Sequence, residues 1–368
     1  MIYLDNGATS FHKPPGVSRA VRQAMLRCAN PGRGGYQAAM EASREVFACR
    51  EEAANLFSCK PEQVVFTSNC THGLNIAIRS LVKPGAKVVI SGFEHNAVAR
   101  PLHGLGAQIT IAGRKLFNWE DTLSRFEDAL KKGMDAAVFT HVSNVFGYIL
   151  PVEEMAALCR QYGVPFILDA AQSAGSIPVS LELGAAFIAM PGHKGLLGPQ
   201  GTGLLLCAGD VSPLLYGGTG SESKRMDMPD FLPDRLEAGT LNVPGIAGLH
   251  AGLKHLRQVG IDKIGKAEHL CAKNCAEGLK RLGYRVFSGP HQAGTVSFVP
   301  EMDCEEMAEI LGKRGIAVRA GLHCAPIAHE SAGTLETGTV RISFGADCHM
   351  GQVQELLRRM SNLRPGKV

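Results

Sequence analysis

Short apolar runs alternate with amphipathic stretches through the first two thirds of the chain. The apolar runs have strand length and are bounded by turn residues, which predicts strands at 64–67, 87–91, 108–112, 136–142, 164–169, 185–190 and 203–207. Between them, apolar residues recur at helical spacing, which predicts helices at 17–28, 40–57, 71–81, 119–130 and 152–162. This alternation is typical of an α/β fold in which helices cover both faces of a mostly parallel, seven-stranded sheet.

The pattern changes after residue 207. Gly, Ser, Pro and charged residues dominate 214–233, which predicts a long loop. Helices then follow at 243–259, 263–282, 304–313 and 351–362, with strands near 286 and at 295–299, 316–319 and 340–344. We therefore expect a large domain at 14–244 and a smaller α+β domain formed by 1–13 and 245–368.

Composition narrows the class of protein. The 368 residues are 45% hydrophobic and 20% charged with a net charge of +4, which is ordinary for a globular chain. No cluster of Lys and Arg suggests nucleic acid, although an anionic cofactor fits the charge. The first residues lack a signal-peptide pattern and no apolar run is long enough for a membrane span, so we expect a soluble, cytoplasmic protein. The eleven cysteines are expected to be reduced.

Two of the predicted strands end in residues that suit one cofactor. Asp169 closes the run 164–169, and Lys194 follows the run 185–190. The carboxyl ends of strands are where α/β folds place ligands. A lysine and an aspartate suit pyridoxal phosphate, whose aldehyde condenses with an amine and whose pyridine nitrogen pairs with a carboxylate. The alternative is a solvated lysine and an aspartate that caps the next helix.

Three further strand ends carry polar residues. Thr71 lies where a strand passes into a helix, and free N–H groups at a helix start suit a phosphate, although they also suit an ordinary cap. His95 could stack on a planar ring or be structural. Asn144 offers an amide to a phenolic oxygen.

Several motifs are open to other interpretations. The glycines at 195, 198, 201 and 203 lack the spacing and following helix of a dinucleotide loop, so we expect them to allow a tight turn. Cys271 and Cys275 are one helical turn apart but have no second pair, so packing is favoured over metal binding.

Cys324 lies in a loop bounded by Gly and Pro, close in sequence to Arg319 and His323. Positive neighbours would raise its thiolate fraction. A zinc site with His329 is disfavoured because no fourth ligand is apparent, and no metal is expected. Arg341 at a strand end could clamp a carboxylate.

These motifs resemble a known family. The chain resembles fold-type-I pyridoxal-phosphate enzymes of aminotransferase class V, in the cysteine desulfurase and selenocysteine lyase group, and the Arg-x-Gly-x-His-Cys-Ala form resembles its second subgroup. The resemblance rests on motifs in the family's order: Tyr3-Leu4-Asp5-Asn6-Gly7-Ala8-Thr9, Asp169-x-x-Gln172, Gly192-His193-Lys194, Glu237-Ala238-Gly239-Thr240, Arg319-x-Gly321-x-His323-Cys324-Ala325 and Val340-Arg341.

The resemblance implies a role for each site residue. Lys194 would bind the cofactor covalently and act as base, His95 would stack on its ring, and Cys324 would take the sulfur. The remaining roles are pairing with the ring nitrogen (Asp169), bonding to the phenolic oxygen (Gln172, Asn144), holding the phosphate (Thr71, His193, and Thr240 from a dimer partner) and binding the substrate (Arg341, with Asn144 and Arg319).

The implied activity is a cysteine desulfurase that turns L-cysteine into alanine and a Cys324 persulfide for a protein acceptor. Selenocysteine lyase, C–S elimination giving pyruvate, and a non-catalytic sulfur-relay role are the alternatives. The chain departs from the family at Pro191, where Ser or Thr is common, at His72, and in the segments 32–36 and 345–349. These departures concern substrate choice and acceptor docking more than cofactor binding.

Overall fold

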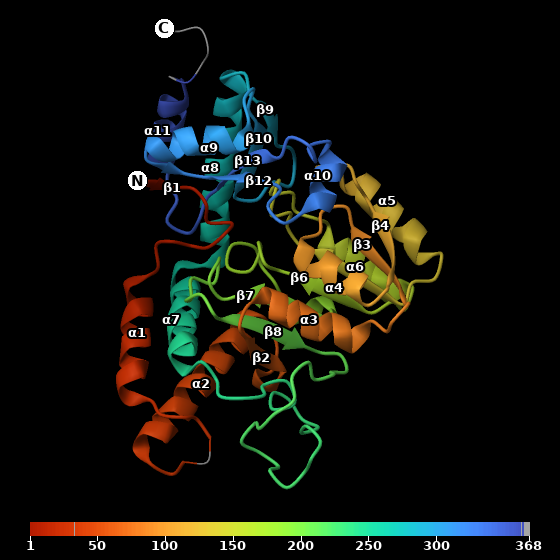
Figure 1. Ribbon diagram of the computed structural model, residues 1–368, viewed down its shortest axis with the longest axis vertical. Helices are drawn as coiled ribbons and strands as arrows, with labels where there is room; N and C mark the ends of the chain where they lie inside the picture. Colours follow the sequence, from red (N-terminus) through yellow and green to blue (C-terminus); the bar gives the residue numbers. More distant parts are fainter. Residues whose placement is uncertain (33, 362, 364–368) are drawn as a thin grey trace.

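A seven-stranded sheet forms the centre of the molecule. The computed structural model describes residues 1–32, 34–361 and 363. Figure 1 shows the sheet with helices on both sides and a separate, smaller layer beside it. The strands of the sheet, in spatial order, are β2 (Val64–Thr67), β8 (Gly203–Cys207), β7 (Phe187–Pro191), β6 (Phe166–Asp169), β5 (Ala136–Thr140), β3 (Lys87–Ser91) and β4 (Gln108–Ala112).

The sheet is mostly parallel, as the sequence predicts. Only β8 runs against its neighbours, β2 and β7. The central strands are buried on both faces, which explains why they appear in the sequence as continuous apolar runs. Alternate residues of β5 serve the two faces, since Ala137 and Phe139 lie in one core cluster while Ala136 and Val138 lie in the other.

Helices cover both faces of this sheet. One face packs against α3 (Cys70–Leu81) and α4 (Asn96–Gly104). The opposite face packs against α2 (Gln37–Leu56), α5 (Trp119–Leu130), α6 (Val152–Gln161) and α7 (Val243–Val259), and α1 (Pro15–Arg27) lies along α7. Each helix buries an apolar stripe, so the sheet is enclosed in a three-layer sandwich.

The C-terminal residues build a second, smaller layer. Its antiparallel sheet has the order β12 (Arg319–Gly321), β13 (Thr339–Ser343), β10 (Thr295–Val299) and β9 (Arg285–Phe287), packed against α8 (Ile261–Arg281), α9 (Cys304–Lys313) and α11 (Met350–Ser361). The N-terminal β1 (Ile2–Tyr3) pairs with β11 (Ile316–Ala317). The chain's first residues therefore lie against its last third, and the predicted domain boundary near residue 245, which stays a prediction, falls inside α7.

Some local predictions were wrong. No helix is predicted at α4, whose apolar pattern is interrupted by Pro101, or at the short α10 (Pro326–Ala332) in the Gly- and Pro-bounded loop. The single strand predicted at 316–319 is two strands, β11 and β12. Residue 33 of the segment 32–36, residue 362 of the predicted last helix and residues 364–368 of the predicted small domain lie outside the described residues.

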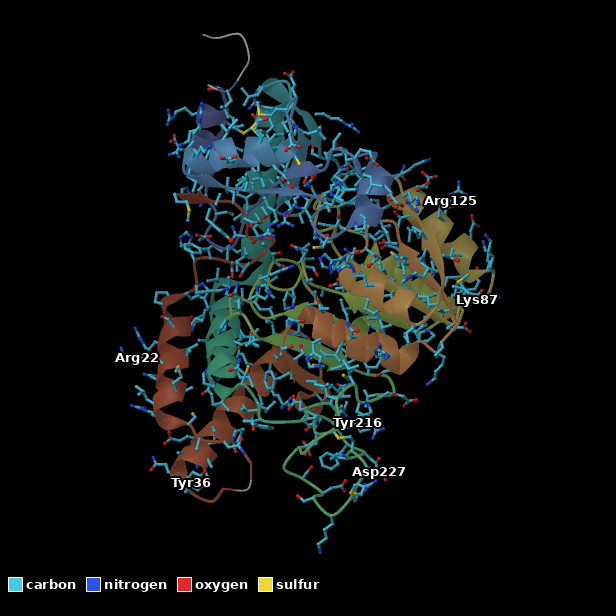
Figure 2. All side chains as sticks on the ribbon, in the orientation of Figure 1. Arg22, Tyr36, Lys87, Arg125, Tyr216 and Asp227 are labelled. Carbon is cyan, nitrogen blue, oxygen red and sulfur yellow. The ribbon has the colours of Figure 1, made fainter. Side chains whose placement is uncertain are left out.

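A long irregular segment connects β8 to α7, as predicted. Figure 2 shows Tyr216 and Asp227 projecting from it, and Tyr216 is 75% exposed. A buried ion pair ties this segment to α2, because Arg50 Nη2 lies 2.5 Å from Glu237 Oε2. The Phe66 N–H donates to Glu237 Oε1 at 2.7 Å, and the Arg50 guanidinium lies over the Phe66 ring. Among the described helices, none has the length and apolar character needed to span a membrane.

The buried pair yields a stability prediction. Arg50→Met should lower the free energy of unfolding by about 3–5 kcal/mol, because it leaves the Glu237 carboxylate buried without its partner. Arg358→Met, which breaks an exposed pair with Glu355, is the control and should cost much less. Denaturant titration measures both losses, and equal losses would contradict the importance of the buried pair.

Candidate functional site

Seven of the predicted site residues line one cavity. It lies at the carboxyl ends of β5, β6 and β7 and at the start of α3, where an α/β sheet places its ligands. The seven are Thr71, His95, Asn144, Asp169, Gln172, His193 and Lys194. The structure therefore brings these strand ends together at one edge of the sheet.

Asp169 is the carboxylate of this cavity. It is the last residue of β6 and is 2% exposed. Its Oδ1 accepts hydrogen bonds from the Ala171 N–H at 2.9 Å and from the Cys70 thiol at 3.5 Å. Burial raises the pKa of Asp169, and these two donors together with the nearby Lys194 ammonium act against that rise. Oδ2 has no partner among the described residues, so it can receive a proton donor.

Lys194 lies just after β7 and directly before a glycine that packs closely. A Cβ at Gly195 would overlap the carbonyl oxygen of Ala174, so glycine allows this segment to approach the turn after β6. Burial, and after it the Arg341 guanidinium, lowers the pKa of Lys194. A lowered amine pKa increases the fraction of neutral, nucleophilic amine at neutral pH.

His95 caps α4 with its ring. The Ala97 N–H donates to His95 Nδ1 at 3.0 Å, which leaves the neutral ring with its proton on Nε2. Burial, and then the charges of Lys194 and Arg341, lowers the pKa of His95 to about 4. The ring is therefore uncharged at neutral pH and able to stack on a planar group.

The two amides predicted for the phenolic oxygen, Asn144 and Gln172, both line the cavity. Asn144 Nδ2 donates to the carbonyl oxygen of His323 at 2.8 Å, and Asn144 Oδ1 is buried without a partner among the described residues. Gln172 Nε2 donates to the Gly7 carbonyl oxygen at 3.0 Å. Each amide keeps a second N–H for a ligand.

The start of α3 forms the anion-binding end. Asn69 caps the helix by accepting from the His72 N–H at 2.9 Å, and Thr71 is exposed in the first turn. Pro191, buried in the cavity wall, cannot donate a hydrogen bond. His193 Nδ1 lies 3.0 Å from Thr9 Oγ1, and burial lowers its pKa to about 4. The helix N-terminus and Thr71 are thus the main donors available to a phosphate.

The predicted substrate residues Arg341 and Arg319 share one carboxylate. Arg341 Nη2 lies 2.8 Å from Asp5 Oδ1, and Arg319 Nε lies 3.1 Å from Asp5 Oδ2. Arg341 is 3% exposed, its Nη1 donates to the Asn144 carbonyl oxygen, and its Nε has no partner among the described residues. Asp5 therefore holds both guanidiniums beside the cavity.

Cys324 is exposed on the turn between β12 and α10. The Asn96 N–H donates to its carbonyl oxygen at 2.7 Å, so the turn is docked against the residue that follows His95. His323 is buried, and burial together with Arg341 lowers its pKa to about 2. The expectation that His323 is a positive neighbour of the thiol is therefore wrong, because its ring is neutral.

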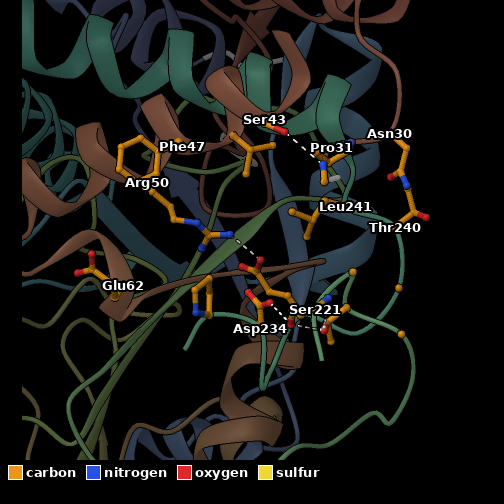
Figure 3. Close-up of a pocket in the computed structure, with 18 of the residues that line it drawn as sticks. Asn30, Pro31, Ser43, Phe47, Arg50, Glu62, Ser221, Asp234, Thr240 and Leu241 are labelled. Carbon is orange, nitrogen blue, oxygen red and sulfur yellow. Dashed lines mark hydrogen bonds and ion pairs between the residues drawn. The ribbon is translucent and has the colours of Figure 1, made fainter. Parts of the chain in front are cut away.

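Thr240 is the one predicted cofactor residue outside the cavity. It is exposed and lines a separate cavity of about 510 Å³ between α2 and the segment that precedes α7, shown in Figure 3. Arg50 and Glu237 form part of the same wall. Within one chain, Thr240 therefore does not contribute to the site around Lys194.

Sequence reasoning missed two buried groups at this site, Cys70 and Glu94. Glu94 is fully buried, and its Oε1 accepts from Ser91 Oγ and from the Thr140 N–H. Its Oε2 has no partner among the described residues, and burial raises its pKa to about 8. Its position directly before His95 was the only signal in the sequence.

The buried Glu94 yields a pH prediction. The folded state holds the Glu94 proton up to about pH 8, whereas an unfolded glutamate releases it near its ordinary pKa of 4.5, so rising pH favours unfolding. Glu94→Gln keeps a neutral side chain and should gain roughly 3–4 kcal/mol of stability relative to the wild type between pH 5 and pH 8. Unfolding titrations across this range measure the difference.

Glu355→Gln is the control for that experiment, because its carboxylate is exposed and its neighbours Arg358 and Arg359 lower its pKa to about 2. It should show no such trend between pH 5 and pH 8. A pH-independent difference between Glu94→Gln and the wild type would mean that Glu94 is ionised in the folded state.

The residues present fit pyridoxal phosphate. Asp169 Oδ2 faces the cavity without a partner, Asn144 Oδ1 is an orphaned buried polar atom, and the helix start supplies N–H groups to an anion. A neutral imidazole and an amine of lowered pKa complete the set.

Comparison with known proteins agrees with this chemistry. Residues 2–356 match the family described as Aminotransferase class-V. A probable cysteine desulfurase from Pyrococcus abyssi is 33% identical over 99% of this chain and 94% of its own length. One from Methanothermobacter thermautotrophicus is 33% identical over 93% of this chain and 90% of its own.

Solved structures give the same result. The apo structure of a cysteine desulfurase from Thermococcus onnurineus NA1 superposes with a TM-score of 0.91 at 33% identity, covering 98% of this chain and 94% of its own. A cysteine desulfurase from Escherichia coli superposes with a TM-score of 0.83 at 26% identity, with the same coverage of both chains. The chain belongs to the aminotransferase class-V family, the family of pyridoxal-phosphate enzymes that its motifs resemble.

Proposed function

We propose that this protein is a pyridoxal-phosphate-dependent cysteine desulfurase. The observation that carries the proposal is the convergence of a lysine, a buried carboxylate and a neutral imidazole in one cavity, with an exposed cysteine on a turn docked beside that imidazole. The names of its relatives support the same activity.

The position of each residue in the cavity indicates its role in the proposed reaction. When bound, pyridoxal phosphate supplies an aldehyde that condenses with amines and a ring that accepts electrons. Lys194 would hold the cofactor and would move the proton at the substrate Cα. Asp169 Oδ2 would pair with the ring nitrogen, and His95 would pack on the ring. Thr71 and the α3 amides would bind the phosphate.

The substrate carboxylate binds beside the paired arginines. Arg341 has an unpartnered Nε, and Asn144 and Arg319 border it. Because Asp5 already neutralises part of this charge, the site favours an amino acid with a single carboxylate over a more highly charged one.

Cys324 takes the sulfur. Its thiolate attacks the sulfur of the bound cysteine, so that an S–S bond forms, the substrate C–S bond breaks and its electron pair stays with carbon. A proton returned to that carbon completes alanine. The balance is L-cysteine plus the Cys324 thiol giving L-alanine plus a Cys324 persulfide, which passes its outer sulfur to a protein acceptor.

The persulfide is directly testable. Protein treated with L-cysteine should gain one sulfur on the Cys324 peptide by mass spectrometry, and Cys324→Ala should lose at least 100-fold in alanine release (an order-of-magnitude expectation for a lost nucleophile) while retaining the yellow cofactor. Cys28→Ala, a half-buried thiol far from the site, should behave like the wild type. Full alanine release by Cys324→Ala would show that a Cys324 persulfide is not part of the reaction.

The same variant separates the alternatives. Selenium leaves carbon more readily than sulfur, so a selenocysteine lyase would retain turnover of L-selenocysteine after Cys324→Ala. A C–S elimination enzyme would release pyruvate and ammonia in place of alanine. A sulfur-relay partner would bind the cofactor fully and turn over neither amino acid.

We further propose a homodimer in which Thr240 reaches the phosphate of the partner subunit. Thr240 lies on an exposed wall that this chain's own site does not use, within the family motif that includes Glu237. The Arg50–Glu237 pair fixes that wall to α2, and the Phe66 N–H fixes it to β2. We also propose a cytoplasmic location, since each of the eleven cysteines is a free thiol and Cys324 has to be reduced to react.

Mixed dimers test the shared site. Lys194→Ala should be inactive, and Thr240→Asp should bind cofactor poorly because its carboxylate repels the phosphate. In a mixed dimer one site has both defects and the other has neither, so mixing the two variants should restore up to about a quarter of wild-type activity if exchange is random. Failure to restore activity, with mixed dimers verified by mass, would place Thr240 outside the partner's site.

A further inference from the structure

Cys70 is a thiol in the wall of the cofactor cavity that the proposed mechanism leaves unused. It is the first residue of α3, is 8% exposed and lines the cavity together with Asp169 and Lys194. Its Sγ lies 3.5 Å from Asp169 Oδ1, within the range of a thiol hydrogen bond.

The carboxylate of Asp169 is held from one side only. Oδ1 accepts from both the Ala171 N–H and the Cys70 thiol, whereas Oδ2 has no partner among the described residues. Two donors on one oxygen fix the rotation of the carboxylate, and they leave the other oxygen for the cavity.

We propose that Cys70 is a positioning residue for Asp169: its S–H donates to Oδ1 and so directs the ionised Oδ2 at the pyridine nitrogen of the cofactor. The inference rests on the role proposed above for Asp169. It does not depend on the fate of the substrate sulfur.

The charges around the Cys70 thiol support its role as a hydrogen-bond donor to Asp169 and argue against its acting as a nucleophile. Burial, and next the Asp169 carboxylate, raises the pKa of the Cys70 thiol well above its ordinary value, so the proton stays on sulfur. A thiol that keeps its proton cannot attack sulfur. The same proton, offered to Oδ1, stabilises the charged form of a carboxylate that burial disfavours.

The capped start of α3 fixes the position of the backbone that carries the Cys70 thiol. Asn69 caps α3 through the His72 N–H, and Thr71 follows Cys70 directly. One capped turn therefore serves both ends of the cofactor, with residue 70 supporting the partner of the ring nitrogen and residue 71 facing the phosphate.

The test compares two ligands that differ in a single atom. Apo forms of the wild type, Cys70→Ala and Cys70→Ser are titrated with pyridoxal phosphate and with its 1-deaza analogue, in which carbon replaces the pyridine nitrogen. Cys70→Ala should weaken pyridoxal phosphate about 3- to 10-fold, the range of one modest hydrogen bond, and leave the affinity for the analogue unchanged. Cys70→Ser retains a donor and should bind both ligands like the wild type.

Cys207→Ala is the matched control, because Cys207 is a buried thiol in the same core cluster whose Sγ lies near the Leu205 carbonyl oxygen, outside the cavity. Thermal unfolding of the apo proteins checks that each variant folds. Equal loss for both ligands, or no loss for either, would overturn the proposal and reduce Cys70 to a space-filling residue. Absence of a Cys324 persulfide would refute the desulfurase proposal and leave this result standing.

Discussion

A buried negative charge at the end of β6 is the constraint on which the rest of the site depends. Taking a carboxylate out of water costs several kcal/mol unless donors and opposite charges compensate. Asp169 has both, since N–H and S–H groups meet one oxygen and Lys194 lies nearby. The other oxygen has no partner among the described residues. In the proposed site a protonated ring nitrogen would compensate its charge, so the energetic cost of burying this group would become affinity for the cofactor.

The sheet explains why these groups converge. In a parallel sheet, the carboxyl ends of neighbouring strands meet at one edge, so β5, β6 and β7 deliver their following residues to the same place. Tight approach of the turns after β6 and β7 needs glycine, as at Gly195 against Ala174. Backbone sterics and strand order together bring the amine near the carboxylate.

Much of this could be predicted from the sequence, for identifiable reasons. Continuous apolar runs located the strands, and Asp169, Lys194, His95 and Asn144 stood at their ends. The helix α4 is not predicted, because Pro101 and polar residues interrupt the helical spacing of its apolar residues. The ion pair between Asp5 and Arg341 joins residues more than 300 positions apart, so no local sequence pattern predicts it. The burial of Glu94 and Cys70 exists only in the folded chain, so no local sequence pattern predicts that either.

The turn that carries Cys324 is pinned at two successive carbonyls, one by Asn144 and the other by Asn96. His323 and Cys324 both adopt left-handed backbone angles, with φ of 50° and 56°, which few non-glycine residues tolerate without support. The backbone that carries the Cys324 sulfur is therefore held in place. The sulfur can change position only by rotation about the Cα–Cβ bond of Cys324. If Cys324 carries the transferred sulfur, as proposed, an acceptor has to bring its own nucleophile to this turn. The protein surface around the turn would then have to recognise the acceptor.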